Sequence, residues 1–379
     1  MFFFDDKINM VMSENFISKR IKPVIMEARI WRGEYIRFYK EAKQSFSDKS
    51  EDIHGSLKDY RKALLKHRVS FGEYMYKFEY WKLDELERDK FISCSEMQCI
   101  YRKMVFPEVK TVFWNKVLFL NKFNEFAKRK WIEVRKSSYE NFCNMVYQFD
   151  CIAKPIEGWR GMGISKIEKV AEGTDLHSLF DECVKNNILL EEKIRACKEI
   201  EEFHPSSLNT VRVVTISNPN KCVVFGAILR MGTGGSLIDN THNGGVFASI
   251  DVKTGVIETD GLDSNGNMYA VHPDSKKPIK GFQIPYWDKV VETCTKATKV
   301  LPKTMYAGWD VVIKDNGEVG LIEGNHGPDF DGGMQAPKKI GVKQRVKDTV
   351  MELYGIDPLQ YISVTSTAYN GYRYNEKVI

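Results

Sequence analysis

Several features that would assign the chain to a familiar class are missing from the sequence. The eight cysteines are scattered and form no C-x-x-C pair, and reduced thiols in a cytoplasmic protein are the simplest account of them. No run of 18 apolar residues occurs, and Met1 is followed by three Phe and then two Asp. That apolar start is too short for a signal peptide, and we expect a cytoplasmic protein without a transmembrane segment.

Common catalytic and binding motifs are also missing. There is no G-x-S-x-G for a serine hydrolase and no Gly-Lys-Ser/Thr ending for a Walker A loop. His204, His242 and His326 have no metal-type spacing, so each is read as structural or solvated. The net charge of +5 is small for 379 residues. It indicates small anionic ligands at most and does not predict nucleic-acid binding.

The composition that remains is 43% hydrophobic and 28% charged, which is typical of a soluble protein of two or three domains. The first 105 residues are poor in glycine, and Val24, Ala28, Trp31, Tyr35 and Phe38 follow the spacing of one helix face. Helical patterns resume over residues 57–66 and 74–86. These patterns predict a helical N-terminal domain whose aromatic stripe is core.

Glycine and strand patterns begin near residue 107. A short strand at 149–156 carries Lys154 and leads into a glycine-rich loop, EGWRGMG at 157–163, followed by a second strand at 164–170. Backbone N–H groups of such a loop can approach phosphate closely, and a buried strand lysine needs a negative charge. The alternative is a plain turn beside a solvent-facing Lys154. Upstream, Lys116 opens a predicted helix that Asn115 can cap.

Two further strands carry arginines. Residues 204–216 place Asn209 and Arg212 at the start of a β run, and residues 222–231 form its expected hairpin partner with Arg230. Such arginines can hold phosphate or carboxylate bidentately, although each alone also suits a protein surface. The apolar strand at 187–194 can offer backbone groups to a purine, or it is simply a buried strand with a charged turn.

The most informative stretch runs from Trp309 to Asn325. Placing Asn316 and Gly317 at the centre of a two-residue turn makes Asp315 face Glu318, Val312 face Leu321 and Asp310 face Glu323. Asn325 then shares a face with Glu323. Opposed carboxylates repel each other, and Mg²⁺ is a suitable partner for them. An ordinary surface hairpin is the alternative.

The order of these pieces resembles the ATP-grasp superfamily, and more closely the sugar-transfer-associated ATP-grasp proteins of surface-polysaccharide gene clusters. The resemblance covers about residues 107–355. The helical segment before it resembles that family only loosely. The matching pieces are Asn115-Lys116, KPIEGWRGMGI, LLEEKI, HPSSLNTVRVVT, Leu229-Arg230-Met231-Gly232, Asp239-Asn240 with Gly244-Gly245, and Asp310 with Glu323-Gly324-Asn325.

The resemblance implies an α+β fold in which two subdomains grip ATP between antiparallel sheets, after a helical N-terminal domain. The expected division is 1–105 for the helical domain, 106–190 and 191–357 for the two ATP-grasp subdomains, and 358–379 for a C-terminal tail.

The resemblance also implies roles for individual residues. Lys116 and Lys154 would contact ATP phosphates under a loop around Gly161 and Gly163. The adenine would lie near Glu191, Glu192 and Ile194, with Glu199 or Glu201 at the ribose. Asp310, Glu323 and Asn325 would hold one or two Mg²⁺. Arg212 and Arg230, together with Lys154, would be catalytic, and Asn209 and Asn240 would be further donors.

These roles predict an ATP- and Mg²⁺-dependent carboxylate–amine ligase that acts through an acyl-phosphate. Its substrates would be a small carboxylate and an amine (an amino acid, a uronic acid or an amino sugar), in capsule or cell-wall glycan synthesis, and other polysaccharide-biosynthesis enzymes would be its partners. One alternative is a kinase on the same scaffold. Another is a non-catalytic, nucleotide-binding scaffold for a glycosyltransferase.

Overall fold

The computed structural model describes residues 22–48, 53–157, 162–236, 239, 244–301, 303–329 and 334–359. Contacts between residues divide the chain into two units. Unit 1 comprises Met1–Pro107, Asp329–Asp331 and Lys339–Ile379, and unit 2 comprises Glu108–Pro328 and Gly332–Lys338. In the part of the chain that is described, no helix combines the length and the apolar character needed to cross a membrane.

Unit 1 is helical in its described residues. Its elements are α2 (Lys22–Ser47), α3 (Leu57–His67), a π-helical turn η3 (Glu73–Lys77), a 3₁₀ turn η4 (Tyr80–Lys82), α4 (Glu85–Arg88), α5 (Cys94–Met104) and α13 (Lys343–Tyr354). The aromatic residues of the stripe predicted on the first helix are confirmed as core, because Phe38 is buried and Trp31 and Tyr35 pack against the same cluster. The side chains of Val24 and Ala28 lie outside the part that is described.

The single helix predicted over residues 74–86 is wrong. The chain there forms η3, η4 and α4, with Glu79 at a positive φ of 54° between the two turns. Tyr74, Phe78 and Tyr80 are all fully buried. Residues 78 and 80 lie on nearly opposite faces of a regular helix, so one helix could not bury both side chains.

The helix α13 lies in unit 1 and not, as predicted, at the end of a subdomain over 191–357. The Lys343 backbone N–H donates to the Lys90 carbonyl at 2.9 Å. The Lys343 ammonium also pairs with Glu96 at 2.9 Å. The helix ends at Tyr354, and Gly355 follows its last turn in the left-handed conformation.

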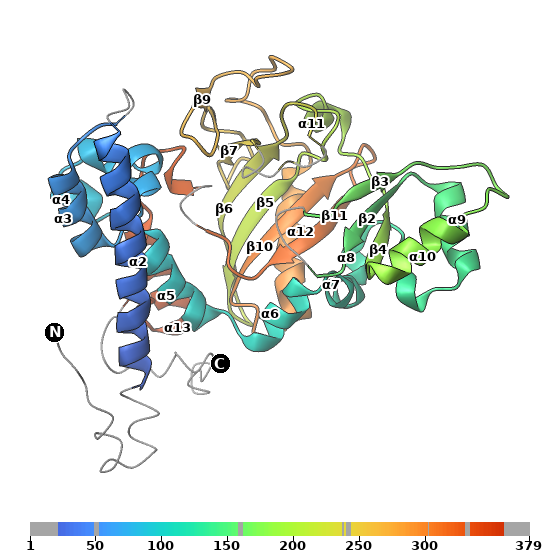
Figure 1. Cartoon of the computed structure of the whole chain (residues 1–379), viewed down its shortest axis with the longest axis horizontal. Coiled ribbons are helices and arrows are strands. Elements are labelled where there is room, and N and C mark those ends of the chain that lie inside the picture. Colours follow the sequence, from blue (N-terminus) through green and yellow to red (C-terminus); the bar gives the residue numbers. More distant parts are fainter. Residues whose placement is uncertain are drawn as a thin grey trace, which may run out of the picture. The chain divides into compact units, whose positions relative to one another are not determined.

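Unit 2 contains two antiparallel sheets (Figure 1). The small sheet has the order β1-β4-β2-β3, and the large sheet has the order β11-β10-β5-β6-β7-β8-β9. The small-sheet strands are β1 (Trp131–Glu133), β2 (Cys151–Pro155), β3 (Ser165–Ile167) and β4 (Ile188–Glu192). The large-sheet strands are β5 (Val211–Ser217), β6 (Cys222–Met231), β7 (Val246–Ile250), β8 (Gly261–Leu262), β9 (Met268–Tyr269), β10 (Tyr306–Ile313) and β11 (Val319–Asn325).

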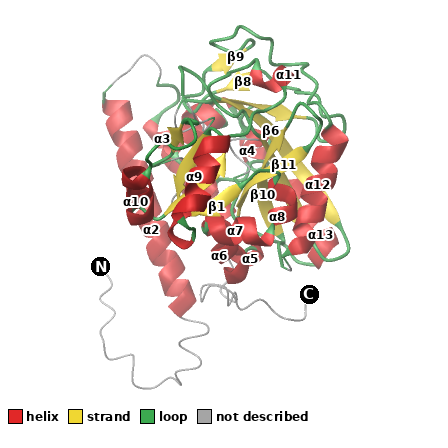
Figure 2. Ribbon diagram, turned by 90° about the vertical axis from the view of Figure 1, so that its right-hand side faces the viewer, coloured by secondary structure: helices red, strands yellow, loops and turns green. Residues whose placement is uncertain are grey.

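Helices cover both sheets of unit 2 (Figure 2). They are α6 (Pro107–Trp114), α7 (Lys116–Lys122), α8 (Asn124–Ala127), the 3₁₀ turn η5 (Val134–Lys136), α9 (Tyr139–Gln148), α10 (His177–Lys185), α11 (Lys198–Glu201) and α12 (Trp287–Val300). Helices α9 and α10 build the core of the small sheet around Phe142 and Leu190. Helix α12 packs on β5, β6, β10 and β11 of the large sheet.

Aromatic packing positions β10 and β11. Trp309 on β10 is fully buried, and its ring lies 5.4 Å from that of Phe113 and 5.5 Å from that of Phe123. A Cβ atom at Gly324 would come within 2.8 Å of Phe119. Only glycine lets β11 approach these rings so closely, and the strand that carries Glu323 is fixed against α6 and α7 in this way.

Candidate active site

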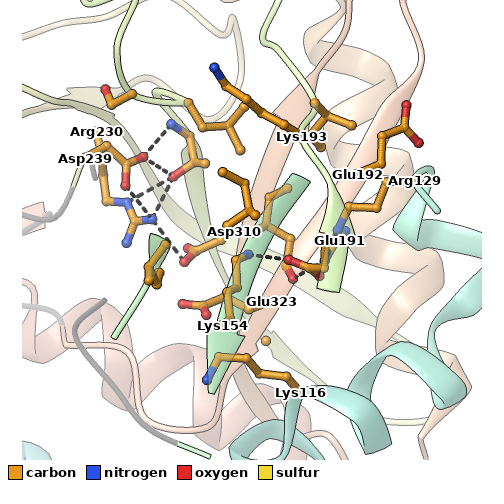
Figure 3. Close-up of a pocket in the computed structure, with 18 of the residues that line it drawn as sticks. Lys116, Arg129, Lys154, Glu191, Glu192, Lys193, Arg230, Asp239, Asp310 and Glu323 are labelled. Carbon is orange, nitrogen blue, oxygen red and sulfur yellow. Dashed lines mark hydrogen bonds and ion pairs between the residues drawn. The ribbon is translucent and has the colours of Figure 1, made fainter. Parts of the chain in front are cut away.

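Unit 2 encloses a cavity of about 460 Å³ lined by residues from both of its sheets (Figure 3). The structure brings many of the predicted site residues to its wall: Lys116, Lys154, Glu191, Glu192, Ile194, Arg230, Asp310, Glu323 and Asn325. Gly161 and Asn240 lie outside the described residues. Arg212, Gly163 and Asn209 are described, but they do not contribute to the wall.

One side of the cavity is built on Glu191 of β4, which is almost fully buried. Its carboxylate pairs with the Lys154 ammonium at 2.5 Å and with the Arg129 guanidinium at 2.6 Å. Burial would raise the pKa of Glu191, but Arg129 and Lys154 outweigh it and lower the pKa to about 2. The carboxylate therefore stays ionised, and the predicted need of Lys154 for a negative partner is met by the protein itself.

Lys116 lies beside this pair at the start of α7. As predicted, Asn115 caps the helix, its side-chain oxygen accepting from the Leu118 N–H at 3.0 Å. The Lys116 ammonium donates to the Pro155 carbonyl at 3.0 Å. Burial lowers the pKa of Lys116, and the carboxylate of Glu323 acts in the opposite direction. Two lysines from different elements thus reach the same side of the cavity.

The part of the glycine-rich loop that is described closes back on its own strand. Gly163 has a φ of +73°, and a Cβ atom there would come within 2.9 Å of the Pro155 ring. Its neighbours Met162 and Ile164 line the cavity instead. Gly163 therefore shapes the loop, and apolar side chains on either side of it face the cavity.

The predicted purine edge at the end of β4 does line the cavity at Glu192 and Ile194. The Glu192 carboxylate accepts from the Lys130 N–H at 3.0 Å. Of the two ribose candidates, Glu201 lines the cavity and pairs with Arg195 at 2.6 Å, whereas Glu199 does not line it.

The β10–β11 hairpin forms another part of the cavity wall, and its turn differs from the predicted one. Lys314 pairs with Glu318, and the Gly317 N–H donates to the Lys314 carbonyl at 2.9 Å. The turn therefore has three residues, with Gly317 at a φ of +72°. The predicted pairing of Asp315 with Glu318 is wrong, and Asp315 instead accepts from the Lys198 N–H at 2.8 Å.

A β-bulge then restores the predicted pairing of Asp310 with Glu323. Val311 faces Leu321, so the predicted pairing of Val312 with Leu321 is wrong, but Asp310 faces Glu323 as predicted. Ile322 is the extra residue that β11 holds between these two pairs. Bulges redirect side chains, and this one brings Glu323 onto the face of Asp310.

Asp310 is the centre of a buried charge network. Arg212 lies directly opposite it on β5 and donates twice, through Nε and through Nη2, the latter at 2.8 Å. Arg230 of β6 donates to the same carboxylate at 3.1 Å. Burial opposes ionisation of Asp310, but the two guanidinium groups outweigh it and hold its pKa well below the usual range. The side-chain amide of Asn325 donates to the Asp310 carboxylate at 3.5 Å.

The donor set at the hairpin fits a hard divalent cation. Asp310, Glu323 and Asn325 offer only oxygen ligands, and burial together with the Asp310 carboxylate raises the pKa of Glu323. A cation between the two carboxylates would relieve this repulsion. No cluster of three or more His, Cys, Asp or Glu side chains suited to a metal occurs among the described residues. Mg²⁺ would therefore also need oxygen ligands from phosphate and water, as is usual for protein-bound Mg²⁺.

The position of Asn209 does not support the prediction that it donates to a ligand. Its side chain is buried, accepting from the Ser207 hydroxyl and the Gly232 N–H and donating to the carbonyls of Ile200 and His204. Every hydrogen-bonding group of the amide is thus used to hold the loop around residues 204–208. That loop presents Ser207 to the cavity.

Several cavity residues were not predicted as site residues. Asp239 accepts from the Thr210 hydroxyl at 2.6 Å and from Arg230 at 3.3 Å, which joins it to the Asp310 network. Trp114 and His326 line the same cavity with ring centroids 6.2 Å apart. Asp239 stands in a stretch that the sequence singled out, next to Asn240. Arg129 carried no such signal, because its partners are distant in the chain.

Comparison with protein families identifies a match over most of the chain. The model of the sugar-transfer-associated ATP-grasp family matches residues 73–350. The match begins earlier than the predicted 107, so it includes part of the helical segment that was expected to resemble the family only loosely. No curated protein matches the sequence.

Solved structures with similar chain traces are described as ligases. The ATP-grasp ligase PsnB, complexed with its minimal precursor, Mg and ADP, is 15% identical with a TM-score of 0.38, covering 65% of this chain and 60% of its own. The VanG D-Ala:D-Ser ligase from Enterococcus faecalis is 13% identical with a TM-score of 0.38, covering 66% and 60%. The L-amino acid ligase from Bacillus licheniformis is 12% identical with a TM-score of 0.36, covering 68% and 48%. The chain therefore matches less than two thirds of each of these proteins.

Proposed function

This chain belongs to the sugar-transfer-associated ATP-grasp family, and on that premise we propose that it is an ATP- and Mg²⁺-dependent ligase that joins a carboxylic acid to an amine. The observation that carries the proposal is that two lysines and an acidic hairpin line one cavity (Figure 3). Anionic phosphates suit the lysines, and a divalent cation suits the carboxylates of the hairpin.

The proposed reaction has two steps. A carboxylate oxygen of the acid attacks the γ-phosphorus of ATP, the bond to ADP breaks, and an acyl-phosphate forms. The amine nitrogen then attacks the acyl carbon, phosphate leaves with the bonding electrons, and the amine loses a proton to solvent. Phosphoryl transfer depends mainly on positioning and charge neutralisation, so it needs no nucleophile from the protein.

The residues of the cavity supply this positioning. Lys116 and Lys154 would hold the phosphates of ATP. Arg230 lies at the cavity wall and would neutralise charge on the transferred phosphoryl group. Arg212 would act indirectly, because it does not line the cavity but donates to Asp310 and neutralises its charge.

Asp310, Glu323 and Asn325 would hold Mg²⁺. When bound there, Mg²⁺ supplies positive charge that offsets the charge of the phosphate oxygens. The protein's part is to keep two carboxylates and an amide on one face of a rigid hairpin, which it does through the bulge at Ile322.

Substrates in surface-polysaccharide synthesis are supported by the association with sugar transfer that defines the family. We propose an amino acid or uronic acid as the acid, and an amino sugar or amino acid as the amine, with polysaccharide-biosynthesis enzymes as possible neighbours. The use of ATP agrees with a cytoplasmic location.

An ADP-release screen tests the proposal. The protein is incubated with ATP, Mg²⁺ and panels of amino acids, uronic acids and amino sugars, and product masses are measured. We expect ADP only where an acid and an amine are both present, with a product lighter than their sum by one water. ADP with a stable phosphorylated product would indicate a kinase instead. Nucleotide binding without turnover across the screen would indicate a binding scaffold.

A further inference from the structure

Arg129 is a buried arginine for which the proposed chemistry has no use. It lies between α8 and β1, and its side chain is 2% exposed. Its guanidinium makes five hydrogen bonds, all to other parts of unit 2. A buried cation that satisfies its donors so completely holds its neighbours in fixed positions.

One side of the guanidinium holds β11. Arg129 donates to the carbonyl of Leu321 at 2.7 Å and to that of Ile322 at 3.0 Å. These are the two residues that together face Val311 at the bulge. An extra strand residue lacks its regular ladder partner, and unpaired buried carbonyls are costly. The arginine donates to both carbonyls at that point.

The bulge decides where Glu323 points. Between the turn and the bulge, Val312 pairs with Gly320 and Val311 with Leu321. If that register continued without a bulge, Asp310 would pair with Ile322. Because side chains alternate along a strand, Glu323 would then leave the face of Asp310.

The other side of the guanidinium holds Glu191. Arg129 donates to one oxygen of this carboxylate at 2.6 and 2.9 Å, while Lys154 takes the other oxygen at 2.5 Å. The same arginine thus contacts the carboxylate that orients Lys154 and the backbone that orients Glu323. Figure 3 shows Arg129 beside Glu191, on the side of the cavity that carries Lys154.

We infer that Arg129 is a positioning residue, which fixes the bulge at Ile322 so that Glu323 faces Asp310 and which ties this hairpin to the Lys154–Glu191 pair. The inference rests on the proposed function, because the expected consequence of this positioning is a correctly formed Mg²⁺ site. A lysine at position 129 could keep the positive charge near Glu191. Its single ammonium cannot donate to two carbonyls and a carboxylate at once, as the planar guanidinium does.

The variant Arg129→Lys tests this inference by binding, with no need for turnover. The probe is AMP-PNP, titrated by calorimetry with and without Mg²⁺. We expect the Mg²⁺ concentration for half-maximal enhancement to rise about 10–100-fold, a loss common when a residue supporting metal ligands is changed. Binding of AMP-PNP without Mg²⁺ should change far less. Amide hydrogen exchange over residues 319–325 of the nucleotide-free protein should become faster.

Arg195→Lys is the matched control. Arg195 also lines the cavity and pairs with a glutamate, Glu201, but it makes no contact with β11. Its replacement should leave the Mg²⁺ dependence and the exchange of residues 319–325 as in the wild type.

Two results would overturn the inference. One is an Arg129→Lys protein with a lower melting temperature but with unchanged Mg²⁺ dependence and unchanged exchange in β11, which would make the role purely structural. The other is the same shift in Arg195→Lys. If Arg129→Lys does not fold, the double variant Arg129→Gln/Glu191→Gln removes both buried charges together and is judged by the same two readouts. A failure of the ligase proposal would appear separately, as wild-type binding without turnover.

Discussion

The two sheets that line the cavity differ in the charge that surrounds their buried carboxylates. On the small sheet, the single carboxylate of Glu191 is held by Arg129 and Lys154, with Lys116 nearby. On the large sheet, Arg212 and Arg230 face Asp310, Glu323 and Asp239. Cations are in excess on the first side and carboxylates on the second.

The balance of charge on each sheet indicates which ligand that part of the cavity suits. An excess of buried cations is costly until an anion arrives, and an excess of buried carboxylates is costly until a cation arrives. Phosphate groups and Mg²⁺ meet these two needs at once when they bind as a complex. The asymmetry follows from the contacts of these side chains and does not depend on similarity to any other protein.

The variant Glu323→Ala should have the largest effect on turnover. Removing one of the two opposed carboxylates should lower ATP turnover by about 10²–10³-fold, as is typical when one electrostatic stabiliser is lost. The fold should persist, because repulsion with Asp310 is relieved. ADP release and a denaturation curve measure the two effects.

Glu318→Ala serves as the control for that variant. Glu318 lies on the same hairpin and pairs with Lys314, away from the cavity wall. Turnover near the wild-type level is expected for it. Equal turnover in Glu323→Ala and Glu318→Ala would remove the metal assignment.

Glu191→Gln tests the other side through stability. Loss of this carboxylate leaves Arg129 and Lys154 buried without their partner, which should cost about 3–5 kcal/mol of unfolding free energy at pH 7. The pKa of Glu191 is lowered to about 2 in the folded chain, from an ordinary value of 4.5. Its stabilisation is thus complete above pH 4.5 and is lost as the pH falls towards 2.

Denaturant titrations of both proteins at several pH values check this dependence. The difference in unfolding free energy between the wild type and Glu191→Gln should become smaller as the pH falls below 4.5. If this difference in unfolding free energy stays constant over the same range, the carboxylate of Glu191 is not stabilised by its two cations.

Lys154→Ala should have the smallest effect of the three. A hydrogen bond to a charged group is worth about 1.5–3 kcal/mol, so AMP-PNP affinity should fall about 10–100-fold. Lys166→Ala is the control, because Lys166 lies on the same sheet but pairs with Asp150 and Glu168 away from the cavity wall. Calorimetry that gives equal affinities for the wild type and Lys154→Ala would exclude a phosphate contact.

Local patterns in the sequence predicted much of this arrangement. The cap of α7 by Asn115, the strand with Lys154 and the opposition of Asp310 to Glu323 all depend on spacing within a few residues or across one hairpin. Long-range partners were not predictable in this way. Arg129 binds Glu191 62 residues away and the carbonyl of Leu321 192 residues away.

Backbone conformation explains why the side chain of Asn209 faces the preceding loop. The sequence places Asn209 at the start of a strong β run, among the expected further donors. In the structure it has a φ of +51°, and its amide turns back into the preceding loop. Asparagine tolerates this conformation better than most residues, but a single sequence does not show when it is used.

The bulge at Ile322 also constrains the length of the hairpin. Asp310 and Glu323 share a face because the odd number of residues in the turn is offset by one extra residue in β11. Deleting one residue of β10 between Asp310 and the turn would move Asp310 away from Glu323, whereas deleting one residue of β11 before Glu323 would remove the bulge and leave the two carboxylates opposed. A shortening of β10 should therefore be accepted over evolutionary time only with a matching change in β11.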